Sequence, residues 1–219
     1  MKNFTVHSAP QGTPEWLAAR LGRVTASRMK DVLAVIKSGE AAARRDYRTQ
    51  LVCERLTGQP QDDVFVSADM QRGTDLEPAA RAAYEAQTGQ WVEQVGFLAH
   101  NELMAGGSPD GVVGDYEGLI EIKCPRPATH INWMRAGEVP AAHAAQIRML
   151  LWLTGAEWCD FISYCPHMPE HLRVYVARVE HAVEESDAVV AAIEKFLGEV
   201  DNEEAALRGW GVIKETANV

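Results

Sequence analysis

Cysteine is scarce and scattered in this sequence of 219 residues. Its four cysteines, Cys53, Cys124, Cys159 and Cys165, never stand in a CxxC pair. Their spacing therefore gives no reason to expect a zinc site or an iron–sulfur cluster. Long apolar runs are also lacking, since none approaches the ~18 residues of a membrane span, and no signal peptide opens the chain. We accordingly expect a cytoplasmic protein in a reducing setting, without a membrane partner.

A basic excess is lacking as well. The formal net charge is -10, and the sequence pI is about 5.2. Proteins that bind polyanions without specificity usually carry excess positive charge, so the balance argues mildly against that class. A local basic groove remains compatible with an acidic exterior. Repeats and low-complexity segments are absent too, and the length predicts one domain over residues 1–219.

The order of apolar patterns predicts helices first, then a sheet interrupted by one strong helix, then a final helix. A capping hydroxyl followed by proline, as in Thr13-Pro14-Glu15-Trp16, is typical of a helix start, and Gly22 ends that helix. A second helix should start at Thr25, because apolar residues recur at helical spacing in Met29, Val32, Leu33 and Ile36. This order indicates a mixed α/β or α+β fold, with a central mixed sheet flanked by helices.

The remaining elements follow from the same reasoning. We expect helices over 42–56, 70–88, 141–153 and 182–207, and strands within 91–99, 103–105, 111–113, 118–124, 158–165 and 172–179. Residues 37–46, residues 58–68 and the segment that contains Trp133 and Pro140 are interpreted as loops. In the final helix the candidate packing positions are Val183, Val190, Ile193, Phe196 and Leu197.

Residues 106–126 hold the group with the clearest chemistry. Asp110 lies in a glycine-flanked turn, and ten residues separate it from Glu121-Ile122-Lys123, which lies in an apolar run. Side chains alternate along a strand, so Glu121 and Lys123 should project to one side. Two carboxylates, with the Ile122 carbonyl between them, are hard oxygen ligands of the kind that Mg²⁺ prefers. With Lys123 to orient or deprotonate a water, the set suits in-line hydrolysis of a phosphodiester.

Three further positions have both a functional and a plain interpretation. Ser27 lies in a first helical turn, where free amides bind anions, and Arg20 is close enough in sequence to reach the same anion. In the plain interpretation, Ser27 is only a helix cap and Arg20 is only a surface cation. Glu77, beside Pro78, is either a site carboxylate or a solvated one. Gln146 shares a stripe with His143, Leu150 and Leu153, so its amide either meets a buried partner or lies at the edge of the buried face.

The residues also resemble a known family. Ser108-Pro109-Asp110-Gly111 followed by Glu121-Ile122-Lys123-Cys124-Pro125 resembles the PD-(D/E)XK nuclease core, and more narrowly the phage lambda exonuclease and YqaJ-type viral recombinase family. Glu15 to Gly22 with Val24 to Ser27 resembles that family's amino-terminal motif. Arg72 to Arg81 resembles its acidic helix, and the Gln146 helix its third core motif. The matches span about residues 12–166, with a strand and helix at 172–207 beyond them.

The resemblance implies a Mg²⁺-dependent 5′→3′ exonuclease, with Mn²⁺ as a possible substitute. Such enzymes degrade linear double-stranded DNA to 5′-mononucleotides and leave a 3′ single strand for an annealing recombinase. A homotrimeric ring around DNA and a phage or prophage origin within a bacterial host are implied as well. By position, Asp110, Glu121 and the Ile122 carbonyl would hold metal, and Lys123 would handle the water. Glu77 would assist with metal or water and Gln146 would support the site, while Arg20, Ser27 and Ser108 would bind the 5′-phosphate.

Two departures narrow the resemblance. RecB-like and Cas4-like relatives place a tyrosine four residues after the motif glutamine, where this chain has Leu150, and some require grouped cysteines. Both differences favour the lambda-type branch. Two alternatives stay open: an endonuclease of the same core fold, of restriction or repair type, and a DNA-end binding protein with a decayed site.

Overall fold

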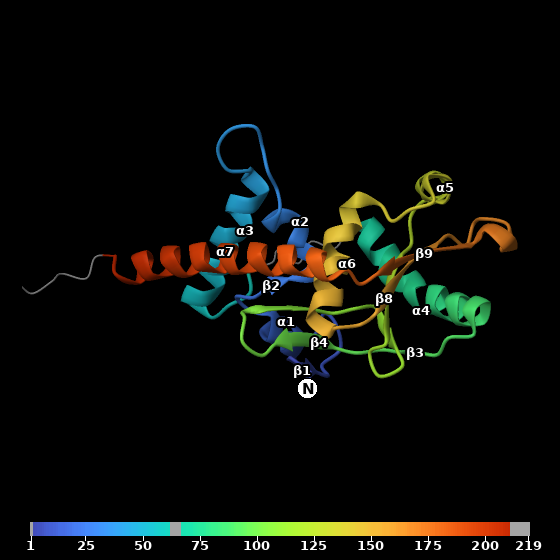
Figure 1. Ribbon diagram of the computed structural model, residues 1–219, viewed down its shortest axis with the longest axis horizontal. Helices are drawn as coiled ribbons and strands as arrows, with labels where there is room; N and C mark the ends of the chain where they lie inside the picture. The colour runs from blue at the N-terminus through green and yellow to red at the C-terminus, as the bar shows by residue number, and fades with distance from the viewer. Residues whose placement is uncertain (1, 62–66, 211–219) are drawn as a thin grey trace, which may run out of the picture.

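The computed structural model describes residues 2–61 and 67–210. The part of the expected 58–68 loop that falls at 62–66 lies outside the described residues. Figure 1 shows the arrangement of the elements. In chain order they are β1 (Phe4–His7), α1 (Pro14–Arg20), β2 (Val24–Thr25), the 3₁₀ turn η1 (Ala26–Arg28), α2 (Met29–Val32), α3 (Ala42–Thr57), α4 (Ala68–Thr88), β3 (Val92–Glu93), β4 (Phe97–His100), β5 (Ala105–Gly107), β6 (Gly111–Val113), β7 (Gly118–Lys123), α5 (Pro127–Ala136), α6 (Ala141–Thr154), β8 (Trp158–Tyr164), the 3₁₀ turn η2 (Glu170–Leu172), β9 (Val174–Glu180) and α7 (Val183–Arg208).

The strands form two mixed sheets with helices around them, so the expected α/β class with mixed pairing is confirmed. One sheet has the order β1-β4-β5-β2, and the other has the order β3-β6-β7-β8-β9. In the second sheet β6 and β7 form the expected antiparallel hairpin, and β7 pairs with β8 in parallel. The sequence indicated a single central sheet, and this division into two was not expected.

Local signals in the sequence set several helix ends. The Thr13 side chain caps α1 by accepting a hydrogen bond from the Trp16 amide at 3.3 Å. The glycines Gly58, Gly89 and Gly155 end α3, α4 and α6 in the left-handed conformation that glycine adopts without strain. The helices expected over 42–56, 70–88 and 141–153 are therefore confirmed to within two residues.

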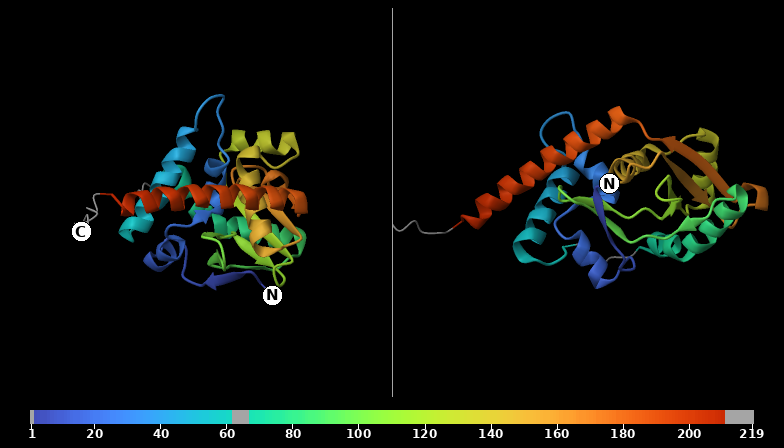
Figure 2. Two further views of the ribbon diagram at one scale, coloured as in Figure 1. Left: turned by 60° about the vertical axis from the view of Figure 1, so that its left-hand side comes forward. Right: turned by 60° about the horizontal axis from the view of Figure 1, so that its bottom comes forward.

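Much of the core lies around α6, which packs against β5 and β8 and also against α7. Five residues of α6 are buried: Ile147, Met149, Leu150, Leu151 and Leu153. Helix α7 runs along the molecule beside α3 and α6 (Figures 1 and 2). It buries Ile193, Phe196 and Leu197 as expected, together with Val189 and Val200, whereas Val183 is 67% exposed. Val183 is thus a wrong prediction, because the first residue of α7 lies on its exposed side while Ser186 in the same turn is buried.

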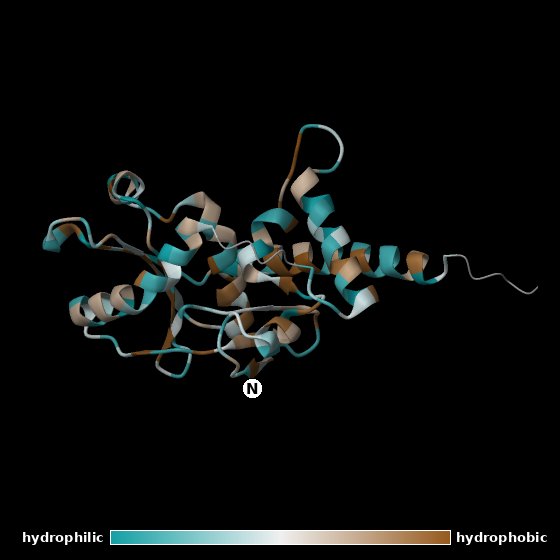
Figure 3. Cartoon of the chain, turned by 180° about the vertical axis from the view of Figure 1, so that it is seen from behind, coloured by the Kyte–Doolittle hydropathy of each residue, from teal (hydrophilic) through white to brown (hydrophobic). Residues whose placement is uncertain are grey.

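Two segments differ from their expected structure. The helix expected from Thr25 to about Ile36 ends at Val32, and Leu33 and Ile36 are 43% and 57% exposed. Their spacing is helical, but no surface of the described chain covers them, and burial is what stabilises so short an amphipathic helix. Figure 3 shows this hydrophobic segment leading out to the tip of a projecting loop. The Trp133 segment, expected to be a loop, contains α5, which begins at Pro127 and is capped by Gly137.

A buried polar contact fastens α4 to the second sheet. The Tyr84 hydroxyl donates to Asp160 Oδ2 at 2.8 Å, and Arg178 donates to both oxygens of the same carboxylate. Tyr84 is fully buried, and Asp160 is 2% exposed. This contact fixes the helix that carries Glu77 against strand β8.

We expect Tyr84→Phe to lower the free energy of unfolding by about 1–2 kcal/mol, because a buried carboxylate loses one hydrogen bond. Urea denaturation measures the change. Tyr175→Phe is the matched control. The Tyr175 hydroxyl is buried without a hydrogen-bond partner in the described part of the chain, so its removal should cost nothing. Equal losses in the two variants would contradict the fastening role of Tyr84.

Candidate active site

Strand β7 and the turn before β6 bring Asp110, Glu121 and Lys123 together. The β6–β7 register pairs Gly111 with Ile120, which sets Asp110 beside the end of β7. Asp110 Oδ2 accepts a hydrogen bond from the Ile122 amide at 2.6 Å. The carboxylate is therefore held by the backbone of the strand that carries the other two side chains.

Glu121 is the buried centre of this group. Its side chain is fully buried; one oxygen accepts from Lys123 Nζ, and the other accepts from Gln146 Nε2 at 2.8 Å. Lys123 Nζ also donates to the Ile122 carbonyl at 3.1 Å. Glu121 and Lys123 thus project to one side of β7, and Gln146 on α6 meets a buried partner. We call Asp110, Glu121, Lys123, Gln146 and Glu77 the carboxylate–lysine cluster.

The electrostatics of this cluster favour a bound cation. Burial raises the pKa of Glu121 to about 7, Lys123 opposes that rise, and Asp110 and Glu77 add to it. Burial alone would lower the pKa of Lys123, but Glu121 and Asp110 outweigh it, so the pKa of the amine lies above its usual range. Lys123 is accordingly an ammonium here, and it supplies the positive charge that the converging oxygens require.

Glu77 lies on α4 at the edge of the same cluster. Its Oε1 accepts a hydrogen bond from Arg81 Nη2 at 2.5 Å, and the same nitrogen donates to the Asp110 carbonyl at 3.3 Å. Burial, followed by the charge of Asp110, raises the pKa of Glu77. Arg81 therefore joins two members of the cluster. Its role was missed, although its position one helical turn after Glu77 is the spacing at which helical side chains pair.

The oxygen donors suit a hard divalent cation. Lys123 Nζ already occupies a position bonded to both Glu121 and the Ile122 carbonyl, so these two oxygens converge on a cation. In residues 2–61 and 67–210, no three His, Cys, Asp or Glu side chains lie close enough to hold a metal by themselves. A metal in this cluster would therefore rely on two carboxylates, the carbonyl and further oxygens such as water, which is a coordination that Mg²⁺ accepts.

The structure also brings together the residues expected to bind phosphate: Arg20, Ser27 and Ser108, here called the arginine–serine group. Strands β2 and β5 are parallel and pair Thr25 with Gly106, so Ser27 and Ser108 follow their strands at matching positions. Trp16 connects Arg20 with Ser108. Its indole donates to Ser108 Oγ at 3.2 Å, and the Arg20 guanidinium lies 4.1 Å from its ring centroid. Trp16 was not among the expected site residues.

Two glycines permit this close arrangement. A Cβ atom at Gly107 would lie 2.7 Å from Leu150 Cδ2 and 2.9 Å from Ala26 Cβ. A Cβ atom at Gly106 would lie 2.5 Å from the Leu98 carbonyl oxygen. Strand β5 can therefore pack directly against α6 and η1 only without a side chain at Gly107, and against β4 only without one at Gly106. The packing holds Ser108 next to the turn that contains Ser27.

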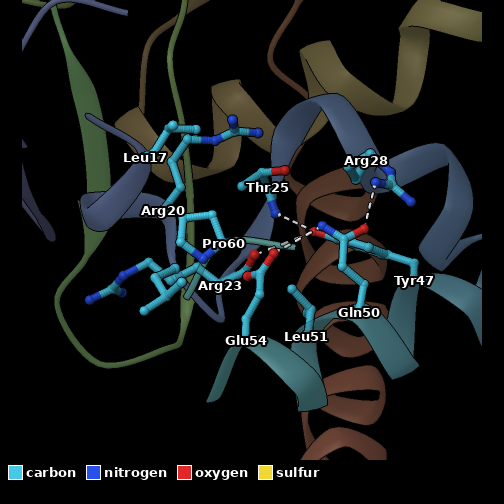
Figure 4. Close-up of a pocket in the computed structure, with 11 residues that line it drawn as sticks. Leu17, Arg20, Arg23, Thr25, Arg28, Tyr47, Gln50, Leu51, Glu54 and Pro60 are labelled. Carbon is cyan, nitrogen blue, oxygen red and sulfur yellow. Dashed lines mark hydrogen bonds between the residues drawn. The ribbon is translucent and has the colours of Figure 1, made fainter. Parts of the chain in front are cut away.

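A small polar cavity adjoins the arginine–serine group (Figure 4). Its volume is about 40 Å³, and its lining includes Arg20, Arg23, Arg28 and Thr25. Glu54 closes one side and accepts a hydrogen bond from the Gly22 amide at 2.8 Å. The Arg28 guanidinium lies 4.2 Å from the Tyr47 ring centroid. Three arginines thus gather here in a chain whose net charge is -10. They form the kind of local basic surface that is compatible with an acidic exterior.

An Asp-turn and a Glu-x-Lys strand, with a glutamine from a covering helix, form the core of PD-(D/E)XK nucleases. The fold and this cluster define the protein as a nuclease of that class. The sequence model of the YqaJ-like viral recombinase domain matches residues 15–157, and the chain belongs to that family.

Solved structures agree with this assignment. The chain is 41% identical to an alkaline exonuclease from Laribacter hongkongensis, with a TM-score of 0.81 and coverage of 90% of this chain and 96% of that chain. A structure of that exonuclease in complex with dAMP matches with a TM-score of 0.82 at the same identity and coverage. A phage-related exonuclease from Haemophilus somnus is 14% identical over 83% of this chain and 96% of its own, and its TM-score of 0.62 shows a shared fold alone. No curated protein sequence matches significantly.

Among the described residues, no helix is long and apolar enough to cross a membrane.

Proposed function

We propose that the protein is a Mg²⁺-dependent 5′→3′ exonuclease that degrades linear double-stranded DNA to 5′-mononucleotides. The observation that carries the proposal is the junction at Ser108-Pro109-Asp110. Ser108 belongs to the arginine–serine group and Asp110 to the carboxylate–lysine cluster, and one buried proline separates them. A phosphate held by the first group therefore lies at a fixed short distance from the second. Such spacing suits an enzyme that cuts a set length from a strand end.

The comparison with the alkaline exonuclease supports this proposal. That enzyme has been solved in complex with dAMP, which is a deoxynucleoside monophosphate. A 5′→3′ exonuclease that breaks the bond between phosphorus and the 3′ oxygen releases a 5′-mononucleotide and leaves a 5′-phosphate on the shortened strand. Each cleavage then regenerates the end that the arginine–serine group would bind.

Each side chain of the carboxylate–lysine cluster has a distinct role in the proposal. Asp110, Glu121 and the Ile122 carbonyl would hold the metal, with Glu77 as an assisting carboxylate. Bound Mg²⁺, or Mn²⁺ in its place, supplies a Lewis acid that offsets phosphate charge and lowers the pKa of water. Gln146 fixes the Glu121 carboxylate through its amide. The Lys123 ammonium orients the attacking water and stabilises the negative charge that develops at phosphorus.

The proposal extends to partners. Double-stranded DNA ends are the substrate, and the remaining 3′ single strand would pass to a single-strand-annealing recombinase. A homotrimeric ring would confine duplex DNA near the arginine-rich surface while the exterior stays acidic. Action on DNA inside a bacterial cell, from a phage or prophage gene, fits the family to which the chain belongs.

Digestion of an end-labelled linear duplex with Mg²⁺ tests the function directly. We expect 5′-mononucleotides as the products, and we expect a covalently closed circular duplex to resist. Cutting of the closed circle would identify an endonuclease instead. Binding of duplex ends without any hydrolysis would identify a DNA-end binding protein with a decayed site.

Arg20→Ala tests the phosphate-binding part of the proposal. We expect the rate ratio between 5′-phosphorylated and 5′-hydroxyl duplexes to fall about tenfold, because a charge-assisted hydrogen bond worth about 1.5–3 kcal/mol is lost. Initial rates on the two substrates give the ratio. Arg45→Ala is a matched control, because Arg45 is exposed and paired with Asp46 on α3. An unaltered ratio in Arg20→Ala would remove Arg20 from end recognition.

A further inference from the structure

Lys30 extends the basic surface beyond the arginine–serine group. It follows Ser27 by three residues, across the end of η1 and the start of α2. Side chains three apart on a helical segment lie on the same face. Ser27 and Lys30 are both exposed, whereas Met29 and Val32 on the same segment are buried. Within residues 2–61 and 67–210, Lys30 forms no ion pair, unlike most of the arginines on α3.

His143 lies on the side of this segment that faces the carboxylate–lysine cluster. It is one turn before Gln146 on α6, and both η1 and α2 pack against that helix. The imidazole stacks on Phe161 with ring centroids 5.5 Å apart, and Trp133 meets it edge-on at 5.6 Å. Phe161 is the β8 partner of Glu121 in the sheet register. These contacts fix the half-buried imidazole beside the strand that carries Glu121 and Lys123.

Two positively charged residues act on His143: Lys123 of the carboxylate–lysine cluster and Lys30 beside the arginine–serine group. Burial, followed by the ammonium groups of Lys123 and Lys30, lowers the pKa of His143 to about 4. Lys30 lies on α2, which packs against α6, and Lys123 lies on β7, which pairs with the strand that holds Phe161. The ring is neutral at physiological pH, and its nitrogens have no hydrogen-bond partner among the described residues. A neutral imidazole donates one N–H, and Lys30 offers an ammonium, so the pair matches the oxygens of a phosphodiester.

We propose that Lys30 and His143 form a contact site for a backbone phosphate of the strand that is cut, between the arginine–serine group and the carboxylate–lysine cluster. The inference rests on the proposed function, because it takes DNA as the ligand. Lys30 contributes charge and affinity, and His143 contributes an oriented N–H without adding charge beside Lys123. Substituting Lys30 should therefore change the salt dependence of DNA binding, whereas substituting His143 should change only the affinity.

Salt-dependent binding to a 5′-phosphorylated duplex in EDTA measures the contact without cleavage. For Lys30→Ala we expect affinity to fall about three- to tenfold at low salt, and the slope of log affinity against log salt to shrink by about 0.9, the share of one phosphate contact. His143→Phe keeps the aromatic packing and removes the nitrogens. It should weaken binding with an unchanged slope, because a neutral group releases no counterion.

Lys195→Ala is the control, because Lys195 is an exposed lysine on α7 that belongs to neither group. A slope for Lys30→Ala equal to that for Lys195→Ala would overturn the inference, as would wild-type affinity in a folded His143→Phe variant. Lys30 is exposed, so its substitution leaves the core intact and the slope interpretable even where His143→Phe folds poorly. Failure of the wild type to bind or degrade duplex DNA would contradict the proposed function instead.

Discussion

Lys123→Ala is expected to abolish hydrolysis of linear duplex DNA, with a loss of at least about 10³-fold in rate, while duplex binding is largely kept. The ammonium of Lys123 is bonded to Glu121 and to the Ile122 carbonyl, so it lies at the centre of the carboxylate–lysine cluster. Removing an oriented charge of this kind costs about 10²–10³-fold in turnover for a single transition-state donor, and a disordered metal site adds to that loss. Single-turnover digestion and duplex binding in EDTA separate the two effects.

The same substitution leaves the buried Glu121 carboxylate without its cation, which threatens folding. Lys123→Gln answers this difficulty, because its amide still donates to Glu121 and carries no charge. A folded, DNA-binding Lys123→Gln variant without hydrolysis supports a direct role for the ammonium. Cleavage at the wild-type rate in either variant would remove Lys123 from the mechanism.

Asp110→Asn is expected to reduce hydrolysis by a similar factor for a different reason. The asparagine oxygen still accepts the hydrogen bond from the Ile122 amide, so the turn before β6 keeps its geometry. The negative charge that would hold Mg²⁺ is lost, and a divalent cation depends on carboxylates in its coordination. Calorimetric titration with Mg²⁺, together with digestion over a range of Mg²⁺ concentrations, measures the loss of affinity.

Asp115→Asn is the matched control for this charge change. Asp115 lies in the turn between β6 and β7, where its side chain is 86% exposed and pairs with Lys2. We expect Mg²⁺ affinity and turnover to match the wild type in that variant. Undiminished Mg²⁺ binding by Asp110→Asn would mean that the metal binds elsewhere.

Sequence reasoning succeeded where the signal was local. The β6–β7 hairpin and the glycine caps at Gly58 and Gly89 follow from turn chemistry and side-chain alternation. The buried partner of Gln146 is one of the two interpretations that the sequence left open, and the structure selects it. The convergence of Asp110 with Glu121 follows from the same hairpin, because an antiparallel pair fixes which residues face each other.

It failed where the outcome depends on distant segments. Leu33 and Ile36 have helical spacing, but only the tertiary structure shows that nothing in the described chain covers them. Trp16 connects Arg20 to Ser108 across 92 residues, and Arg81 meets the Asp110 carbonyl across 29. Such contacts leave no periodic trace in the sequence. Helix α5 is different, since its start at Pro127 and its end at Gly137 were present in the sequence, but the segment was interpreted as a loop.

The two groups of candidate site residues adjoin different sheets. The arginine–serine group adjoins β2 and β5 of one sheet, and Asp110, Glu121 and Lys123 of the carboxylate–lysine cluster lie on β7 and just before β6 of the other. Under the proposed function, we therefore expect substitutions in the first sheet to alter which kinds of DNA end are accepted while the hydrolytic chemistry in the second is preserved. Pro109 joins the two groups, because it lies between Ser108 and Asp110 in the chain. Under the proposed function, the choice of DNA end can thus be changed by substitution separately from the length of the fragment removed.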